Sequence, residues 1–113
     1  MAPKNPVIEH DIQNDIRAWC GEHNLLAIRI NVGLFKTIIG DRVVDAGPPR
    51  GWPDLQILDN NGRLLFCECK AKYGRLSDDQ KRVHKVLKER KFPVIVPKSL
   101  EHFIKEMNGY GYE

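Results

Sequence analysis

The stretch from Gly51 to Gly74, GWPDLQILDNNGRLLFCECKAKYG, decides the fold. An apolar segment over 54–59, an Asn-Asn-Gly turn and a second segment over 63–72 predict a hairpin of two antiparallel strands. Residues two apart on a strand share a face, so Glu68 and Lys70 point the same way although the strand begins as the apolar run Leu-Leu-Phe-Cys. A carboxylate and an ammonium on one face of such a strand need a chemical reason.

Asp54 and Glu68 are expected to lie side by side. With the turn centred on Asn61, Asp54 stands seven positions before the centre and Glu68 seven positions after it, which places them opposite each other. Two adjacent carboxylates repel each other unless a positive charge lies between them. A divalent metal ion satisfies both, and oxygen-only ligation with open positions for water suits Mg²⁺ or Mn²⁺. Asp54 and Glu68 are therefore predicted metal ligands and catalytic residues.

Lys70 completes a catalytic group for phosphodiester hydrolysis. It lies one side chain beyond Glu68 on the same face, where it can orient or deprotonate an attacking water and balance charge in the transition state. Cys67 and Cys69 point the opposite way, and because no histidine lies near them we expect core packing rather than zinc binding. His84 is expected at the surface, with a phosphate contact as the alternative.

The remaining elements predict a mixed sheet flanked by helices. Apolar residues repeat at helical spacing over 6–22, and a capping box, Ser77-x-x-Gln80, begins a second helix that ends near Arg90. Further segments are a strand over 25–32, a hairpin over 37–44, a strand over 92–96 and a last helix that begins at Ser99. With the hairpin over 37–44 set apart, the order is α-β-β-β-α-β-α, an α/β fold.

The length of 113 residues predicts a single domain over 1–113. A composition of 42% hydrophobic and 29% charged residues is typical of soluble globular proteins. No run of apolar residues is long enough for a membrane span, and the N-terminus lacks the apolar segment of a secretion signal. Three cysteines cannot all pair, which favours a reduced, cytoplasmic protein.

Basic residues concentrate in one part of the chain. Residues 70–91 contain nine Lys and Arg against three acids, although the net charge of the whole chain is only +3. Such clustering attracts a phosphate backbone, and the alternative is a solvated helix face. No base-reading motif accompanies the cluster, which favours recognition of nucleic-acid shape over sequence. The predicted backbone contacts are Lys36, Arg42, Arg50, Lys72, Arg75, Lys81 and Lys85.

The order Pro53-Asp54, thirteen residues, then Glu68-Cys69-Lys70 resembles the PD-(D/E)xK nuclease signature. A wider set of positions resembles one branch of that superfamily, the VRR-NUC (virus-type replication-repair nuclease) domain. This set comprises Glu9, Arg29-x-Asn31-x-Gly33, Gly51-x-Pro53-Asp54, Phe66-x-Glu68-x-Lys70 and Gly74-x-Leu76-Ser77-x-x-Gln80. The resemblance covers nearly the whole chain and implies a restriction-endonuclease-like fold.

The resemblance also implies metal-dependent cleavage of DNA, often at branched structures, by a stand-alone phage-type homodimer acting in a bacterial host. It adds Glu9 and Gln80 to the active centre and the Cys69 carbonyl to the metal ligands. Two of these have a plainer explanation: Glu9 is an acid in a first helical turn, and Gln80 completes a capping box. The function expected is a structure-selective DNA endonuclease that resolves a four-way (Holliday) junction. A sequence-specific or non-specific nuclease and a DNA-binding module without catalysis remain alternatives.

Overall fold

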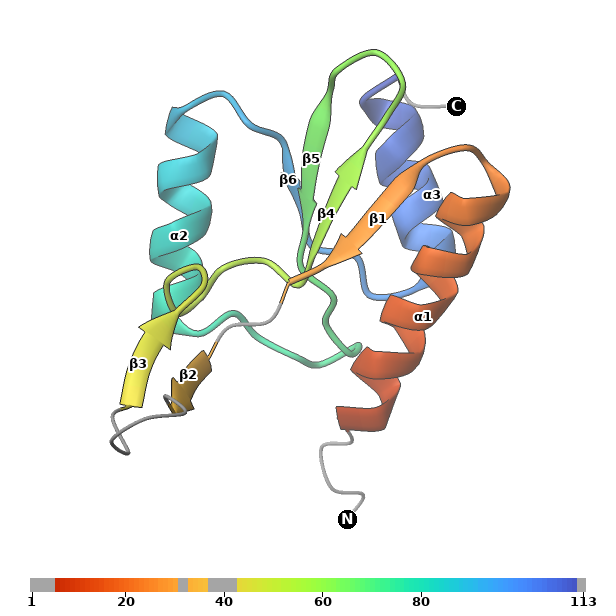
Figure 1. Cartoon of the computed structure of the whole chain (residues 1–113). Coiled ribbons are helices and arrows are strands. Elements are labelled where there is room, and N and C mark those ends of the chain that lie inside the picture. Colours follow the sequence, from red (N-terminus) through yellow and green to blue (C-terminus); the bar gives the residue numbers. More distant parts are fainter. Residues whose placement is uncertain (1–5, 31–32, 37–42, 112–113) are drawn as a thin grey trace.

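The computed structural model describes residues 6–30, 33–36 and 43–111, whose elements are labelled in Figure 1. The helices of this part of the chain are α1 (Pro6–Glu22), α2 (Asp78–Glu89) and α3 (Leu100–Gly109). Its strands are β1 (Leu26–Arg29), β2 (Gly33–Lys36), β3 (Val43–Ala46), β4 (Leu55–Leu58), β5 (Leu64–Cys67) and β6 (Val94–Ile95).

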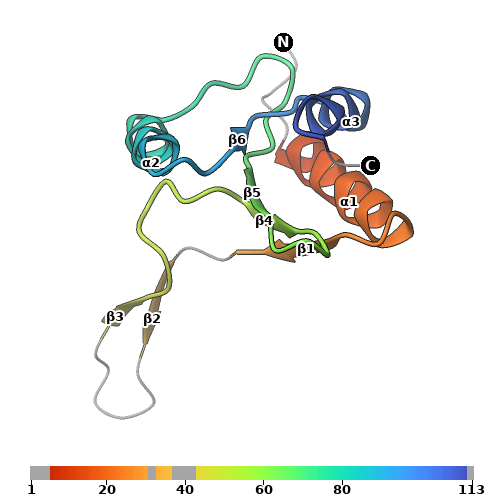
Figure 2. The ribbon, with the colours of Figure 1, turned by 90° about the horizontal axis from the view of Figure 1, so that it is seen from above.

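The main sheet has the strand order β1-β4-β5-β6. Strands β1, β4 and β5 pair in antiparallel fashion, and β6 pairs with β5 in parallel, so the predicted mixed sheet is confirmed. Strands β2 and β3 form a separate antiparallel pair that extends away from the sheet (Figure 2). The predicted α-β-β-β-α-β-α order is also confirmed. Of the hairpin predicted over 37–44, residues 37–42 lie outside the described residues, and the observed pair joins residues 33–36 to residues 43–46.

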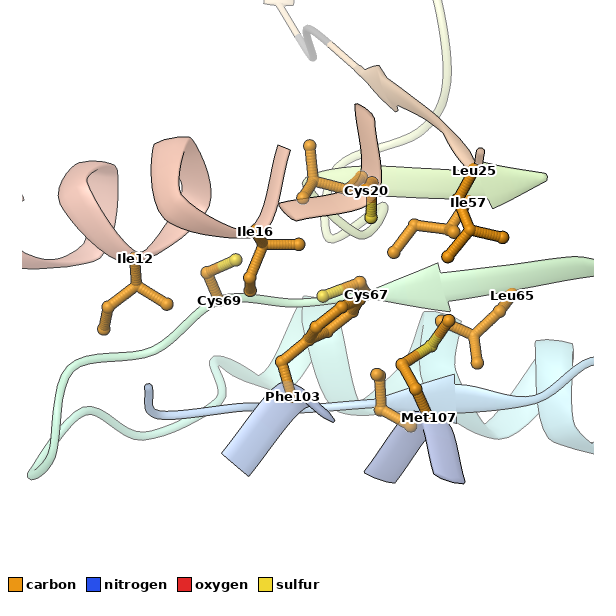
Figure 3. Packing of buried hydrophobic residues seen from close by; sticks show 12 residues of the cluster. Ile12, Ile16, Cys20, Leu25, Ile57, Leu65, Cys67, Cys69, Phe103 and Met107 are labelled. Atoms are coloured by element: carbon orange, nitrogen blue, oxygen red, sulfur yellow. The ribbon is translucent and has the colours of Figure 1, made fainter. Parts of the chain in front are cut away.

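Helices α1 and α3 lie together on one face of the sheet, and α2 lies on the other (Figures 1 and 2). The main core fills the space between the sheet and the first pair of helices (Figure 3). The helical spacing predicted for α1 is confirmed by Ile12, Ile16 and Cys20, all buried, whereas Ile8 is 47% exposed near the free end of the helix. Among the described residues, no helix is both long enough and apolar enough to cross a membrane.

A smaller apolar cluster anchors α2 to the sheet through Phe66, Leu87 and Val94. The helix begins at the predicted capping box. The Ser77 hydroxyl accepts a hydrogen bond from the Gln80 backbone N–H at 3.1 Å, and the Gln80 side-chain oxygen accepts one from the Ser77 N–H at 2.8 Å. Both exchanges satisfy N–H groups that a helix start leaves unpaired, so the position of Gln80 is well fixed.

The two strands of the hairpin around Asn61 are shorter than predicted, because pairing stops at Leu55 on β4 and Cys67 on β5. After β5, the chain no longer pairs with β4 and instead forms hydrogen bonds with β6 and the residues that follow it. The Glu68 N–H donates to the Ile95 carbonyl at 2.9 Å, and the Lys70 N–H donates to the Pro97 carbonyl at 3.2 Å. Glu68 and Lys70 are thus held on the β6 side of the sheet, just after the end of β5, whereas the sequence predicted that the strand itself contains them.

Candidate active site

Asp54 and Glu68 lie together at the end of the main sheet, as the sequence predicted. Leu55 pairs with Cys67, so the next residues outward in the same register are Asp54 and Glu68. The Cys69 N–H donates a hydrogen bond to Asp54 Oδ2 at 2.8 Å, which ties the first carboxylate to the segment that carries the second. Glu68 is only 1% exposed, although a residue at a strand end is usually solvated.

Both carboxyl groups hold protons more tightly than they would in water. Burial, and after it the negative charge of Glu68, raises the pKa of Asp54 to about 7. Burial also raises the pKa of Glu68 to about 7, against the opposing effects of the Asp54 hydrogen bond and the Lys70 charge. A pair of carboxylates in this state lacks a sufficient positive charge. A bound cation would supply it.

Lys70 acts on both carboxylates, since its charge lowers the pKa of each of them. Its side chain is half-buried, and its backbone is fixed by the hydrogen bond to Pro97. The ammonium is therefore close enough to the pair to influence a reaction there. Its charge is outweighed by burial, so it does not remove the need for a further cation.

His84 contacts Glu68 from α2, and this contact was missed at the level of sequence. The prediction that His84 lies at the surface is wrong: the residue is 4% exposed, and its Nε2 lies 3.3 Å from Glu68 Oε1. Burial, and then the charges of Lys88 and Lys70, lowers the pKa of His84, so the ring is neutral and can donate Nε2–H to the carboxylate. The burial of His84 could have been inferred from its position three residues before Leu87, which puts both side chains on the buried side of α2.

Helix α1 brings two further polar residues to the site. The charge of Glu9 contributes to the raised pKa of Glu68, which places the predicted residue within electrostatic reach of the pair. Glu9 also packs close to Gly74, where an added Cβ would stand 3.4 Å from Glu9 Oε2. One turn later, Gln13 is buried on the same side of the helix. The sequence suggested no role for Gln13.

A cleft of about 340 Å³ opens beside Asp54, and we call it the Asp54 cleft. Its lining consists of Gln13, Arg29, Ile30, Gly51, Trp52, Asp54 and Gln80. Gly51 has a φ of +89°, and a Cβ at this position would lie 2.4 Å from the backbone of Asp79. Only glycine allows the loop before Asp54 to approach the start of α2 so closely. This approach brings Gln80 to the cleft while its oxygen still serves the capping box, so both expectations for Gln80 are compatible.

The donor set at this site fits a hard divalent cation. Two carboxylates converge, and both have raised pKa values that a cation would relieve. The thiols of Cys67 and Cys69 are buried in the main core, as predicted, so only the carbonyl of Cys69 remains as a candidate ligand. Within the described residues, no group of three or more His, Cys, Asp and Glu side chains is arranged to hold a metal. Asp54 and Glu68 would therefore leave most of the coordination positions to water and to substrate.

The predicted phosphate contacts are exposed wherever the structure describes their side chains. These are Arg50, Lys72, Arg75, Lys81 and Lys85, whereas Arg42 and the side chain of Lys36 lie outside the described set. Lys81 and Lys85 line a groove of about 510 Å³ on α2, together with Lys88 and His84. His84 therefore lies between this basic groove and Glu68.

Comparisons with known proteins agree with this fold. The profile of the VRR-NUC domain matches residues 8–100. A solved structure of a VRR_NUC domain superposes with a TM-score of 0.68 at 19% sequence identity, covering 91% of this chain and 97% of that one. A comparison with curated proteins finds no match. The family match spans most of the chain and includes the whole segment from Asp54 to Lys70, and the chain belongs to the VRR-NUC domain family.

Proposed function

We propose that this protein is a Mg²⁺- or Mn²⁺-dependent endodeoxyribonuclease that hydrolyses phosphodiester bonds in branched DNA. The observation that carries the proposal is the pair formed by the half-buried Asp54 and the buried Glu68, which lie side by side with raised pKa values and with Lys70 next to them. Family membership supports a nuclease-type fold. It leaves the substrate and the cofactor to be argued from the residues.

Asp54, Glu68 and the Cys69 carbonyl would hold the divalent ion, which when bound supplies Lewis acidity that makes a water molecule a better nucleophile. His84 keeps one oxygen of Glu68 occupied, so the other oxygen has a fixed direction. The Cys69 N–H does the same for Asp54 Oδ2. Lys70 orients the attacking water and offsets the negative charge that grows on the phosphate during the reaction.

A structure-selective substrate fits the distribution of charge better than a sequence-specific one. Exposed basic residues lie along α2 and on the loops that lead to it, where they can follow phosphates. Phosphate contacts position DNA but carry no sequence information. We therefore propose a four-way junction as the preferred substrate, with a non-specific or sequence-specific nuclease of the same fold as the alternative.

A binding module without catalysis is the second alternative, and the pair of carboxylates with raised pKa values argues against it. Two carboxylates with pKa values near 7 destabilise the fold at neutral pH and repel phosphate. A DNA-binding surface gains nothing from them, whereas a metal-dependent hydrolase requires them. Hydrolysis also gives a reason for Lys70 to stand beside the two carboxylates, where its charge acts on both of them.

Cleavage of a labelled four-way junction tests the proposal. The junction and its linear duplex arms are incubated with Mg²⁺, Mn²⁺ or EDTA, using the wild type, Asp54→Ala and, as a matched control, Asp59→Ala at the other end of β4. We expect metal-dependent nicks in the junction that Asp54→Ala abolishes and Asp59→Ala retains. Equal cutting of linear duplex would remove the structure selectivity, and tight binding without cutting under any metal would indicate a binding module.

We also propose that the protein acts as a homodimer, because one chain holds one centre and symmetric resolution of a junction needs two. Sedimentation at the concentrations of the cleavage assay measures this directly. A monomer that retains paired cleavage would contradict the dimer and leave the nuclease standing.

A further inference from the structure

Gln13 holds a polar atom for which the described part of the chain provides no partner. Gln13 is only 9% exposed. Among the described residues, its Oε1 is a buried side-chain oxygen that accepts no hydrogen bond. A buried amide oxygen without a donor is destabilising, and such atoms are rare in folded proteins. An unpaired oxygen at a site therefore points to a ligand that supplies the missing donor.

The position of Gln13 identifies where that ligand must lie. Gln13 lines the Asp54 cleft from α1, and it shares the cleft with Asp54 and Gln80. It also stands one helical turn after Glu9, whose charge contributes to the raised pKa of Glu68. The residue that carries the unpaired oxygen therefore lines the same site as the proposed chemistry.

The chemistry of an amide oxygen limits what can bind to it. The oxygen only accepts hydrogen bonds, so it cannot bind a phosphate oxygen, which is also an acceptor. The Trp52 indole N–H of the same cleft already donates to Gln56 Oε1 at 3.1 Å. A water molecule has two donors and is small enough for a polar cleft of about 340 Å³.

We propose that Gln13 is a positioning residue whose Oε1 accepts a hydrogen bond from the water that attacks the phosphate. A water that gives one hydrogen to Gln13 keeps a lone pair free, and a fixed direction for that lone pair favours attack. Gln13 itself makes and breaks no covalent bond. The inference rests on the proposed function, since it assigns a role within the same site.

The test compares the same substitution at two glutamines, Gln13→Met and Gln56→Met. Methionine keeps the length of the side chain and removes the polar atoms. At position 13 it removes an unpaired buried acceptor, so we expect the Tm in EDTA to rise by roughly 4 °C or more. At position 56 it removes a paired oxygen and leaves the Trp52 N–H without its acceptor, so the Tm is expected to fall.

Kinetics on the junction substrate give the second measurement. Loss of water positioning should lower kcat of Gln13→Met by roughly 10- to 100-fold and leave KM within about threefold, because substrate contacts remain. Gln13→Glu keeps an acceptor oxygen at the same place and is expected to recover at least tenfold of the lost kcat. This variant also keeps the experiment decisive if the methionine variant fails to fold.

A fall in Tm for Gln13→Met, parallel to that for Gln56→Met, would make Gln13 a structural residue and overturn the inference. A higher Tm with an unchanged kcat would overturn it as well, since the acceptor would then have no part in the reaction. A raised KM with an unchanged kcat would indicate a substrate contact instead of a water contact. If the wild type cleaves no DNA, the proposed function is wrong, and the inference about an attacking water is overturned with it even where the melting comparison confirms an unpaired acceptor.

Discussion

Replacing Asp54 by asparagine should make the metal-free protein more stable while it abolishes catalysis. The pKa of Asp54 is raised from 3.8 to about 7 by burial and by the charge of Glu68. Each unit of difference corresponds to about 1.4 kcal/mol, so ionisation of Asp54 opposes folding by at most roughly 4 kcal/mol. Relaxation of the site and coupling to Glu68 reduce this, and we expect Asp54→Asn to gain about 2 kcal/mol at pH 8.

The sign of the pH dependence follows from the direction of the shift. The folded state binds a proton at Asp54 more tightly than the unfolded state, so the stability of the wild type falls as the pH rises toward 7 and levels off above it. Asparagine does not titrate, and it can still accept the Cys69 N–H. The advantage of the variant should therefore be largest at pH 8 and should shrink toward pH 5.

Urea denaturation in EDTA at pH 5, 6, 7 and 8 measures this difference, with Asp59→Asn as the control at the opposite end of β4. Glu68 has its own raised pKa, so about half of the pH dependence should persist in Asp54→Asn. Adding Mg²⁺ should then stabilise the wild type and leave the variant unchanged, since only the wild type retains both proposed ligands. A wild type whose stability rises between pH 5 and 8, or a variant less stable than the wild type at pH 8, would refute the reasoning.

Three further predictions concern the surroundings of the site. Gly51→Ala should lower the free energy of unfolding, measured in urea, by roughly 2 kcal/mol or more, because an alanine there combines a positive φ with a clash against the Asp79 backbone. The control Gly21→Ala, in an open part of α1, should be neutral or stabilising. His84→Leu should remain folded by circular dichroism and lose roughly 10- to 100-fold in kcat, because Glu68 loses the donor that orients it; an unchanged kcat would show that the contact has no role. A thiol reagent should find none of the buried cysteines in the native protein and all three in urea, and a rapidly reacting native thiol would contradict their burial.

The carboxylate pair could be predicted from the sequence because its geometry is local. An Asn-Asn-Gly turn fixes the register of a hairpin, and symmetry about Asn61 then fixes which residues face each other. Lys70 and the core cysteines follow from strand alternation in the same few residues. The capping box at Ser77 was predictable for the same reason, since a helix start depends on neighbours in the chain.

The contributions of His84 and Gln13 could not be predicted in this way. Each lies on a helix beside apolar residues, and burial of a polar side chain there depends on which strand end the helix covers. The extent of the strands was missed for a related reason. The backbone N–H groups of Glu68 and Lys70 donate to the carbonyls of Ile95 and Pro97. A pairing between segments so distant in the chain leaves no periodicity in either segment.

The unfavourable features of this domain are concentrated in one place. Three residues at this place have an unmet need: the half-buried Asp54 just before β4, the buried Glu68 after β5 and the buried Gln13 on α1. The two carboxylates lack a positive charge, and the glutamine oxygen lacks a hydrogen-bond donor. Three elements that merely packed together would have no reason to place these groups at a shared site. A divalent ion with its bound waters meets all three needs at once, because the ion supplies the charge and the waters supply the donors. This coincidence, more than any single residue, favours a metal-dependent hydrolase over a binding module.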